Sequence, residues 1–304
     1  MANRLFNNIV LEPAVELTPF ISIASLDRQK LCVDLLDETP RVDKYFSKRF
    51  GDNFVFCPKA REGIVIVLKE LNLQPNDVVT ILTTTGSPYI SGCVTKAIEQ
   101  VCKWSRNIEP TTKVLFVNHE FGYSYNDVTS LKKYNLPIIE DCAHSFFTES
   151  PDIGIVGDYV IYSLPKPFSI QLGGVIKYKD TITYKCPDDI IQYIKSALEP
   201  QIDEVNQMID KRFENYDYYL KTLKGLGIKP YFKMKKGDVP GAFMFTWPRC
   251  KDYRKLKALM NDNGIDSSVF FGNDAYFVPV HHNVSKNEIE YICNIIKFFN
   301  VENN

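Results

Sequence analysis

The sequence lacks several patterns that would assign it to a specialised class. Its eight cysteines form no C-x-x-C pair, and none lies at metal-ligand spacing from one of the four histidines. No apolar run is long enough to span a membrane, and the first residues lack the pattern of a signal peptide. The 36 basic and 37 acidic residues nearly cancel, which argues against a general nucleic-acid-binding surface. We therefore expect a cytoplasmic protein without a metal, a nucleic-acid partner or a membrane partner.

The chain is longer than one average domain. It has 304 residues, of which 45% are hydrophobic, so it can bury a sizeable core. The residue pattern changes twice along the chain, and no repeat or low-complexity linker interrupts it. We therefore expect a lead-in over residues 1–50, a large domain over 51–185 and a smaller domain over 186–304.

Short runs rich in Val and Ile alternate with helical segments in the first two thirds of the chain. The expected strands span residues 54–58, 78–82, 113–118, 137–141, 159–163 and 174–178, and the expected helices span 41–50, 60–71, 94–104 and 126–134. Such alternation is typical of a mostly parallel sheet with helices on both faces. The sequence therefore predicts an α/β fold for this part.

After about residue 185 the pattern becomes that of a smaller α+β domain. A long, charged and amphipathic stretch over 188–223 is expected to be helical. A strand is expected at 242–247, and further helices are expected at 252–263 and 285–299.

Three residues with possible chemical roles follow predicted strands. Asp141 ends one strand, Ser163 ends the next, and Lys166 comes three positions later. In open parallel sheets, ligands bind beyond the carboxyl ends of the strands. Taken singly, however, an aspartate at a strand end is usually a turn residue, and a loop lysine is usually solvated.

The surroundings of Lys166 favour a chemical role. It lies between Pro165 and Pro167, with apolar neighbours and a later Gly173-Gly174 pair. Apolar surroundings destabilise an ammonium group, so the neutral amine becomes available as a nucleophile for Schiff-base chemistry. A pyridoxal ring also needs a carboxylate to keep its nitrogen protonated, and Asp141 can supply that charge.

An ordered set of motifs runs from His119 to Gly174. These are His119-Glu120-Phe121-Gly122, then Leu136-Pro137-Ile138-Ile139-Glu140-Asp141-Cys142-Ala143-His144, Gly157-Asp158, Tyr162-Ser163, Lys166 and Gly173-Gly174. The set resembles the DegT/DnrJ/EryC1/StrS family, fold type I pyridoxal-phosphate enzymes that mostly aminate nucleotide-linked keto-sugars. A later segment, Phe277-Val278-Pro279-Val280-His281, is similar to the one before the family's last helix, so the resemblance covers roughly residues 50–300.

The resemblance implies a role for each matching residue. Asp141 would pair with the nitrogen of the cofactor ring, and His144 would lie against that ring. Ser163 would contact the cofactor phosphate, and Lys166 would form the internal aldimine. The fold implied is that of fold type I: a mostly parallel central sheet flanked by helices, plus a smaller C-terminal α+β domain.

One segment departs from the common family pattern, and one family position is harder to assign. Where the family has Ser-Gly-Thr at the start of a helix, this chain has Lys59-Ala60-Arg61. The backbone N–H groups of Ala60 and Arg61 would still meet the phosphate, and Arg61 would add charge, although an arginine here also suits a surface ion pair. The aromatic residue that stacks on the ring is expected to be Tyr89, although an aromatic residue after a proline more often only packs.

The resemblance implies an aminotransferase that moves an amino group, from glutamate, to a nucleotide-linked keto-sugar, as a homodimer and in surface-polysaccharide or antibiotic-sugar assembly. Two alternatives stay open. Some relatives dehydrate or deoxygenate the sugar, but they replace the aldimine lysine with histidine, so Lys166 favours amino transfer. Several family segments are shortened or missing here, which would also suit a binding or partner subunit without catalysis.

Overall fold

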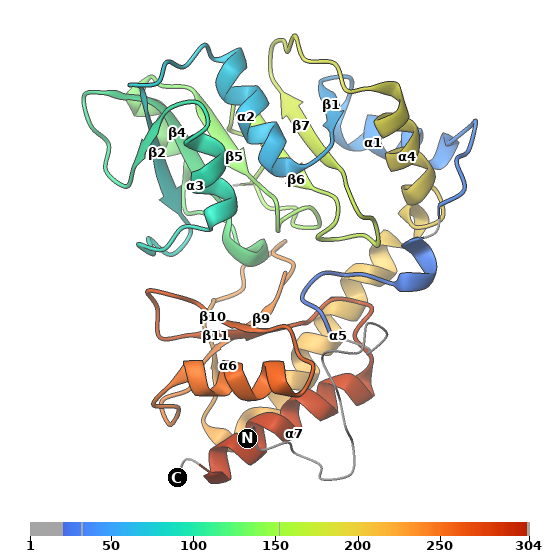
Figure 1. Cartoon of the computed structure of the whole chain (residues 1–304), viewed down its shortest axis with the longest axis vertical. Coiled ribbons are helices and arrows are strands. Elements are labelled where there is room, and N and C mark those ends of the chain that lie inside the picture. Colours follow the sequence, from blue (N-terminus) through green and yellow to red (C-terminus); the bar gives the residue numbers. More distant parts are fainter. Residues whose placement is uncertain (1–20, 32, 152, 303–304) are drawn as a thin grey trace. The chain divides into compact units, whose positions relative to one another are not determined.

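The described residues form two compact units. The computed structural model describes residues 21–31, 33–151 and 153–302 (Figure 1). The sheet unit comprises Leu26–Asn206 with Lys235–Val239. The C-terminal unit comprises the described residues before Leu26, Gln207–Met234, and the residues from Pro240 onward.

A sheet of seven strands organises the sheet unit, in the order β1-β7-β6-β5-β4-β2-β3. The strands are β1 (Phe54–Cys57), β2 (Val78–Thr83), β3 (Lys103–Ser105), β4 (Thr112–Asn118), β5 (Ile138–Asp141), β6 (Tyr159–Ser163) and β7 (Gly174–Tyr178). From β3 to β6 all neighbouring strands are parallel, whereas β7 is antiparallel to both β6 and β1. The prediction of a mostly parallel sheet is confirmed.

Both faces of this sheet are covered, which explains why its strands are apolar without alternation. Val114 and Phe116 of β4 pack in one core cluster with helices α2 (Ala60–Glu70) and α3 (Gly92–Ile98). Leu115 and Val117 of the same strand pack in another cluster with η3 (Val128–Tyr134). Figure 1 shows α2 and α3 together on one side of the sheet.

The bounds of the two compact units differ from those predicted for the domains. Helix α1 (Pro40–Phe50) contacts α4 (Asp188–Leu198), and α4 contacts β1, so the chain on both sides of residues 51–185 packs with the large sheet. Phe46 of α1 lies in an aromatic cluster with Phe56 of β1 and with Phe146. The division between the units falls inside α5 (Val205–Leu223), after Asn206.

Three of the predicted helices were wrong in extent or type. The helical stretch expected at 188–223 is interrupted and forms two helices, α4 and α5, because Pro200 lies between them and a proline lacks the N–H that a helix interior requires. The helix expected at 94–104 ends at Ile98, and its last residues form edge strand β3, paired with β2. The one expected at 126–134 is the 3-10 segment η3, capped by Asp127.

The C-terminal unit is α+β, as predicted. Its antiparallel sheet has the order β10-β11-β9-β8, with β8 (Lys229–Pro230), β9 (Phe243–Thr246), β10 (Ser268–Val269) and β11 (Tyr276–Val278). Helices α6 (Tyr253–Asp262) and α7 (Lys286–Glu302) supply buried residues to the same core as this sheet, among them Leu256 and Ile292. Within the described part of the chain, no helix is both long and apolar enough to cross a membrane.

Candidate functional site

The carboxyl ends of three parallel strands meet at a cavity of the sheet unit. Asn118 ends β4, Asp141 ends β5 and Ser163 ends β6, and all three line this cavity, whose volume is about 350 Å³. Its other lining residues come from the starts of α2 and α3 and from the segments after β5 and β6: Lys59, Ala60, Arg61, Ile64, Ser91, Cys93, Val94, Ala143, His144, Pro165, Lys166, Gln171 and Gly173. The volume lies within the usual range of ligand pockets, about 300–1,000 Å³.

Six of the seven predicted site residues line this cavity: Ala60, Arg61, Asp141, His144, Ser163 and Lys166. The seventh, Tyr89, is not among the lining residues, and 45% of its surface is exposed. Its neighbour Ser91 does line the cavity, so the segment after β2 reaches the site. The stacking role of Tyr89 stays a prediction.

Sequence reasoning missed Asn118, which the structure brings against Asp141. The two residues are paired in register at the ends of β4 and β5, and the Asn118 amide donates a hydrogen bond to Asp141 Oδ2 at 2.8 Å. The signal was present in the sequence, because Asn118 ends one predicted parallel strand as Asp141 ends another.

The Asp141 carboxylate is buried but fully hydrogen-bonded. Only 4% of the residue is exposed, and its second oxygen accepts the backbone N–H of Ala143 at 3.0 Å. Burial raises the pKa of Asp141, while the hydrogen bonds from Ala143 and Asn118 and the positive charge of Lys166 oppose that rise. A cation placed in the cavity beside this carboxylate would therefore stabilise its ionised form.

Lys166 is held in the same cavity by an anchored turn. Leu164 and Phe168, on either side of it, are fully buried, and the Phe168 N–H donates to the Leu164 carbonyl at 3.0 Å. Lys166 itself is half-buried, and its charge acts on Asp141. The turn thus places a primary amine and a buried carboxylate in one cavity.

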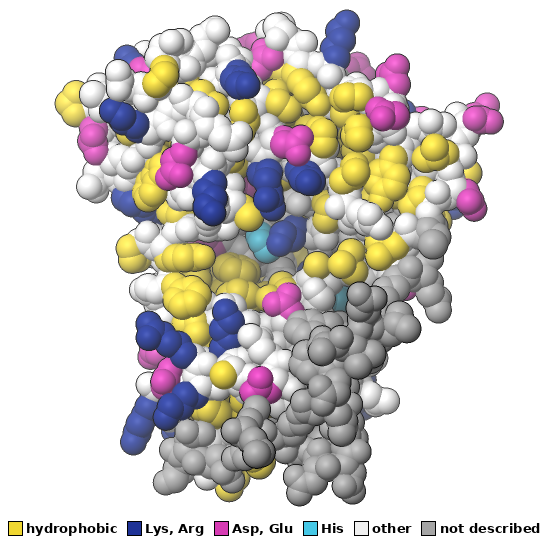
Figure 2. Space-filling view, viewed as in Figure 1, with side chains coloured by type: hydrophobic (Ala, Val, Ile, Leu, Met, Phe, Trp, Pro, Cys, Tyr) yellow, Lys and Arg dark blue, Asp and Glu magenta, His cyan; other side chains and the backbone are white. Residues whose placement is uncertain are grey.

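The start of α2 forms another part of the cavity wall. Gly174 of β7 lies so close to it that an added Cβ would be 2.9 Å from the Ala60 nitrogen. The Gly173-Gly174 pair therefore lets β7 approach the helix start, and the Gly173 N–H donates to the Pro58 carbonyl at 2.6 Å. Helix N-termini attract anions, and the exposed Lys59 and Arg61 add positive charge. Figure 2 shows basic side chains gathered at the lower end of α2 in that view, beside a histidine.

Behind Asp141, on the other side of the sheet, lies a buried network around Glu140. Its carboxylate accepts three backbone N–H groups, from Gly154 (2.7 Å), Val156 (2.9 Å) and Gly157 (2.6 Å). It also accepts a hydrogen bond from His119 Nε2 at 2.9 Å. Because His119 Nδ1 accepts the backbone N–H of Tyr125, the ring proton lies on Nε2. His119, Glu140 and Cys142 have ligand atoms within 4.8 Å of one another, but a metal would have to displace these N–H donors.

We expect Glu140→Gln to destabilise the protein without cofactor by about 3 kcal/mol, because an amide NH2 would face N–H donors. Burial alone would raise the pKa of Glu140, but hydrogen bonds from His119, Gly157 and Gly154 outweigh it and lower the pKa. The carboxylate therefore stabilises the fold above its unfolded pKa, and this contribution is lost as the pH falls through the lowered value. Urea unfolding at pH 7 and at acid pH measures both effects.

The control for Glu140→Gln is Glu109→Gln, since the exposed Glu109 carboxylate accepts the Ser105 hydroxyl on the surface. Equal stability of the two variants would contradict this account of Glu140.

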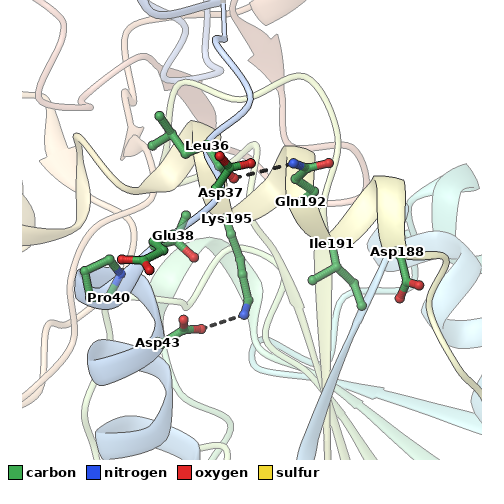
Figure 3. Close-up of a pocket in the computed structure, with 10 residues that line it drawn as sticks. Leu36, Asp37, Glu38, Pro40, Asp43, Asp188, Ile191, Gln192 and Lys195 are labelled. Atoms are coloured by element: carbon green, nitrogen blue, oxygen red, sulfur yellow. Dashed lines mark hydrogen bonds and ion pairs between the residues drawn. The ribbon is translucent and has the colours of Figure 1, made fainter.

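A wider groove of about 580 Å³ lies between the segment 36–43 and α4 (Figure 3). Lys195, the one lysine among its described lining residues, forms an ion pair with Asp43 at 2.6 Å, and Gln192 donates to the Leu36 carbonyl. The other charged lining residues, Asp37, Glu38 and Asp188, are all acidic. This groove lacks the pairing of an amine with a buried carboxylate that the smaller cavity has.

The groups in the smaller cavity fit pyridoxal phosphate. That cofactor needs an amine for its aldehyde, a carboxylate for its ring nitrogen, and cationic or N–H donors for its phosphate. The cavity supplies Lys166, Asp141 and the start of α2 with Arg61. Together with the parallel sheet, these groups define a fold type I pyridoxal-phosphate enzyme.

Comparison with known proteins identifies the family. The model of the family described as "Putative PLP-dependent aminotransferase" matches residues 42–216, more than half of the chain. The chain belongs to this family: it is a pyridoxal-phosphate-dependent aminotransferase, and its cofactor is pyridoxal phosphate. No curated protein matches the chain in sequence.

Solved structures share the fold at low sequence identity. Spr1654 from Streptococcus pneumoniae, described as a "putative sugar aminotransferase" in its PLP-form, has a TM-score of 0.71 at 14% identity, over 94% of this chain and 99% of that one. The aminotransferase TlmJ from Streptoalloteichus hindustanus has a TM-score of 0.68 at 14% identity, over 86% and 91%. A DegT DnrJ EryC1 StrS aminotransferase from Brucella abortus has a TM-score of 0.68 at 15% identity, over 86% and 90%.

Proposed function

We propose that this aminotransferase moves an amino group from glutamate to a nucleotide-linked keto-sugar, with Lys166 and Asp141 as its catalytic residues. The observation that carries the proposal is the meeting of a half-buried lysine and a buried carboxylate in one cavity, where the charge of Lys166 acts on Asp141. The sugar is suggested by the structural neighbours, several of which are described as sugar aminotransferases.

Lys166 does two things in this proposal. Its Nζ would hold the aldehyde carbon of the bound cofactor between reaction cycles. When it is not bonded to the cofactor, the same Nζ would take up and return a proton at the reacting carbon, as a general base and then a general acid. Pyridoxal phosphate, when bound, supplies the electron sink that stabilises the carbanion.

Asp141 and the neighbouring residues hold the cofactor. The Asp141 carboxylate, oriented by Asn118 and Ala143, keeps the ring nitrogen protonated. His144 would lie against the ring, and Tyr89 would be the aromatic residue that stacks on it.

The cofactor phosphate has its own set of partners. The Ser163 hydroxyl and the backbone N–H groups of Ala60 and Arg61 donate hydrogen bonds to it, and the Arg61 guanidinium neutralises its charge.

The assembly and setting proposed are those of the resembling family. The enzyme acts in the cytoplasm as a homodimer, in the assembly of a surface polysaccharide or a related sugar product. Light scattering of the purified protein tests the dimer.

The half-reaction with the amino donor tests the proposed chemistry. L-Glutamate added to the cofactor-loaded enzyme is expected to release one 2-oxoglutarate per active site and to remove the absorbance of the lysine-bound cofactor, because the donor's amino group would remain on the cofactor as an amine and no imine to Lys166 would be left. D-Glutamate is the matched control, since only one enantiomer presents its α-proton to Lys166. A nucleotide-linked keto-sugar should then restore the lysine-bound form. Absence of 2-oxoglutarate would exclude glutamate as donor, and absence of restoration would exclude the sugar acceptor.

A further inference from the structure

The segment Thr84–Ser91, between β2 and α3, brings Ser91 to the cavity wall, and the first residues of α3 follow it there. Two charged side chains, Arg106 and Glu120, hold this segment, and neither belongs to the described residues that line the cavity. Glu120 follows β4, and Arg106 lies in the connection between β3 and β4. Because these two residues contact the segment and do not line the cavity, we expect their effect on the cavity to be transmitted by the segment.

Glu120 binds the beginning of the segment through Thr85. Only 6% of Glu120 is exposed, and its Oε2 accepts both the backbone N–H and the hydroxyl of Thr85, each at 2.7 Å. The Glu120 N–H in turn donates to the Thr84 hydroxyl at 3.0 Å. Three hydrogen bonds therefore tie two consecutive residues of the segment to Glu120.

Arg106 binds the middle of the segment through Ser87. One guanidinium nitrogen donates to the Ser87 carbonyl at 2.7 Å and to the Thr83 hydroxyl at 3.3 Å, and another donates to the Ile81 carbonyl. Burial raises the pKa of Glu120, while the hydrogen bonds from Thr85 and the positive charge of Arg106 oppose the rise. The two side chains thus hold the same segment at neighbouring residues, Thr85 and Ser87.

Hydrogen bonds within the segment extend this fixation toward the cavity. The Thr85 hydroxyl, held by Glu120, accepts the N–H of Ser87 at 3.2 Å. The Ser87 hydroxyl then accepts the N–H of Tyr89 at 3.2 Å. Two residues further, Ser91 caps α3 by accepting the N–H of Cys93 at 3.3 Å. A displacement of Thr85 would therefore be transmitted along the segment to Ser91, which lines the cavity.

Two residues close to Glu120 in the sequence, Asn118 and Phe121, contact residues that line the cavity. Asn118 binds the Asp141 carboxylate, and the ring of Phe121 lies 5.2 Å from the ring of His144. Phe121 has a left-handed backbone (φ 54°), which an L residue with a side chain rarely adopts and which strains the chain there. The contacts of Glu120 and His119 hold the chain on the amino side of this strained residue.

We propose that Glu120, with Arg106, is a positioning residue that fixes the Thr84–Ser91 segment and thereby sets the affinity of the cavity for pyridoxal phosphate. The inference rests on the proposed role of this cavity. It adds two residues that are not among the described residues lining the cavity.

Two measurements on Glu120→Gln test the proposal. Hydrogen exchange of the cofactor-free protein should show faster exchange of the amides in 84–91, with the amides of β5 and β6 unchanged. Titration with pyridoxal phosphate should show binding weakened roughly tenfold, as is usual when a residue supporting a bound group is lost. Thr85→Val, which replaces the hydroxyl with a methyl group, should weaken cofactor binding by about threefold. If Glu120→Gln does not fold, this variant tests the positioning role in its place. The matched control is Glu99→Gln, since the exposed Glu99 accepts one hydrogen bond, from Trp104, in the same half of the sheet unit.

The outcomes separate this proposal from the proposed function. If the unaltered protein binds no pyridoxal phosphate, the cavity assignment fails whatever Glu120 does. Binding by the unaltered protein, with equal affinity in Glu120→Gln and Thr85→Val, would overturn the positioning role alone. Faster exchange in 84–91 without weaker binding would overturn it too, and so would weaker binding without faster exchange.

Discussion

The Lys166→Ala variant is expected to lose at least about a thousandfold of the amino-transfer rate while it still folds. General acid–base catalysis alone contributes about 10²–10⁴-fold, and the same amine also attaches the cofactor. Lys166 is half-buried in a turn that Leu164 and Phe168 anchor, so removal of the side chain should leave the turn intact. Single-turnover kinetics with the amino donor, followed by cofactor absorbance, measure the loss.

Two controls make this result specific to the amine. Lys113→Ala removes an exposed lysine of β4 and should leave the rate unchanged. A small primary amine added to Lys166→Ala should restore part of the rate, because it can transfer the proton in place of the missing side chain. If Lys166→Ala keeps the activity of the unaltered enzyme, the catalytic assignment of Lys166 is wrong.

Asp141→Asn is expected to lower the amino-transfer rate by about a hundredfold or more and to weaken cofactor binding. A neutral amide cannot keep the ring nitrogen protonated, so the electron sink becomes weaker. The substitution keeps the shape of the side chain, and the Asn118 amide can rotate to present its oxygen to the new NH2 group. Rates and cofactor affinity measured together should therefore fall without loss of the fold.

The same variant should raise the stability of the protein without cofactor. Burial raises the pKa of Asp141, so the folded protein binds its proton more tightly than the unfolded chain does. The free energy of unfolding then falls as the pH rises from the unfolded to the folded pKa of Asp141. Above the folded pKa, the charged carboxylate destabilises the cofactor-free fold. Melting temperatures at neutral pH should be higher for cofactor-free Asp141→Asn than for the unaltered protein. A lower melting temperature, or full activity, would contradict this account of Asp141.

The central sheet could be predicted from the sequence because its strands are short apolar runs with clear ends. Elements that depend on distant partners were harder to predict. Val101 and Trp104 extend a helical pattern of apolar residues, yet the chain from Lys103 pairs with β2 as an edge strand. The strands of the second sheet are only two to four residues long, and β8, β10 and β11 carry no pattern of their own. The break at Pro200 was readable, since proline rarely continues a helix.

The candidate site could be predicted where strand order determines position. Asp141, Ser163 and Asn118 end neighbouring parallel strands, and such ends meet at one edge of a sheet. Glu120 and Arg106 could not be found in this way, because their partners Thr85 and Ser87 lie on a loop whose path no periodicity specifies. The cavity positions of Cys93 and Gln171 were missed for the same reason.

Chemical trapping of the cofactor tests the central claim most directly. The protein is incubated with pyridoxal phosphate, reduced with borohydride, digested, and its peptides are analysed by mass spectrometry. Our account predicts the mass of the reduced cofactor on Lys166, and on no peptide that carries only Lys59 or another lysine. Attachment to a different lysine, or no attachment at all, would contradict it.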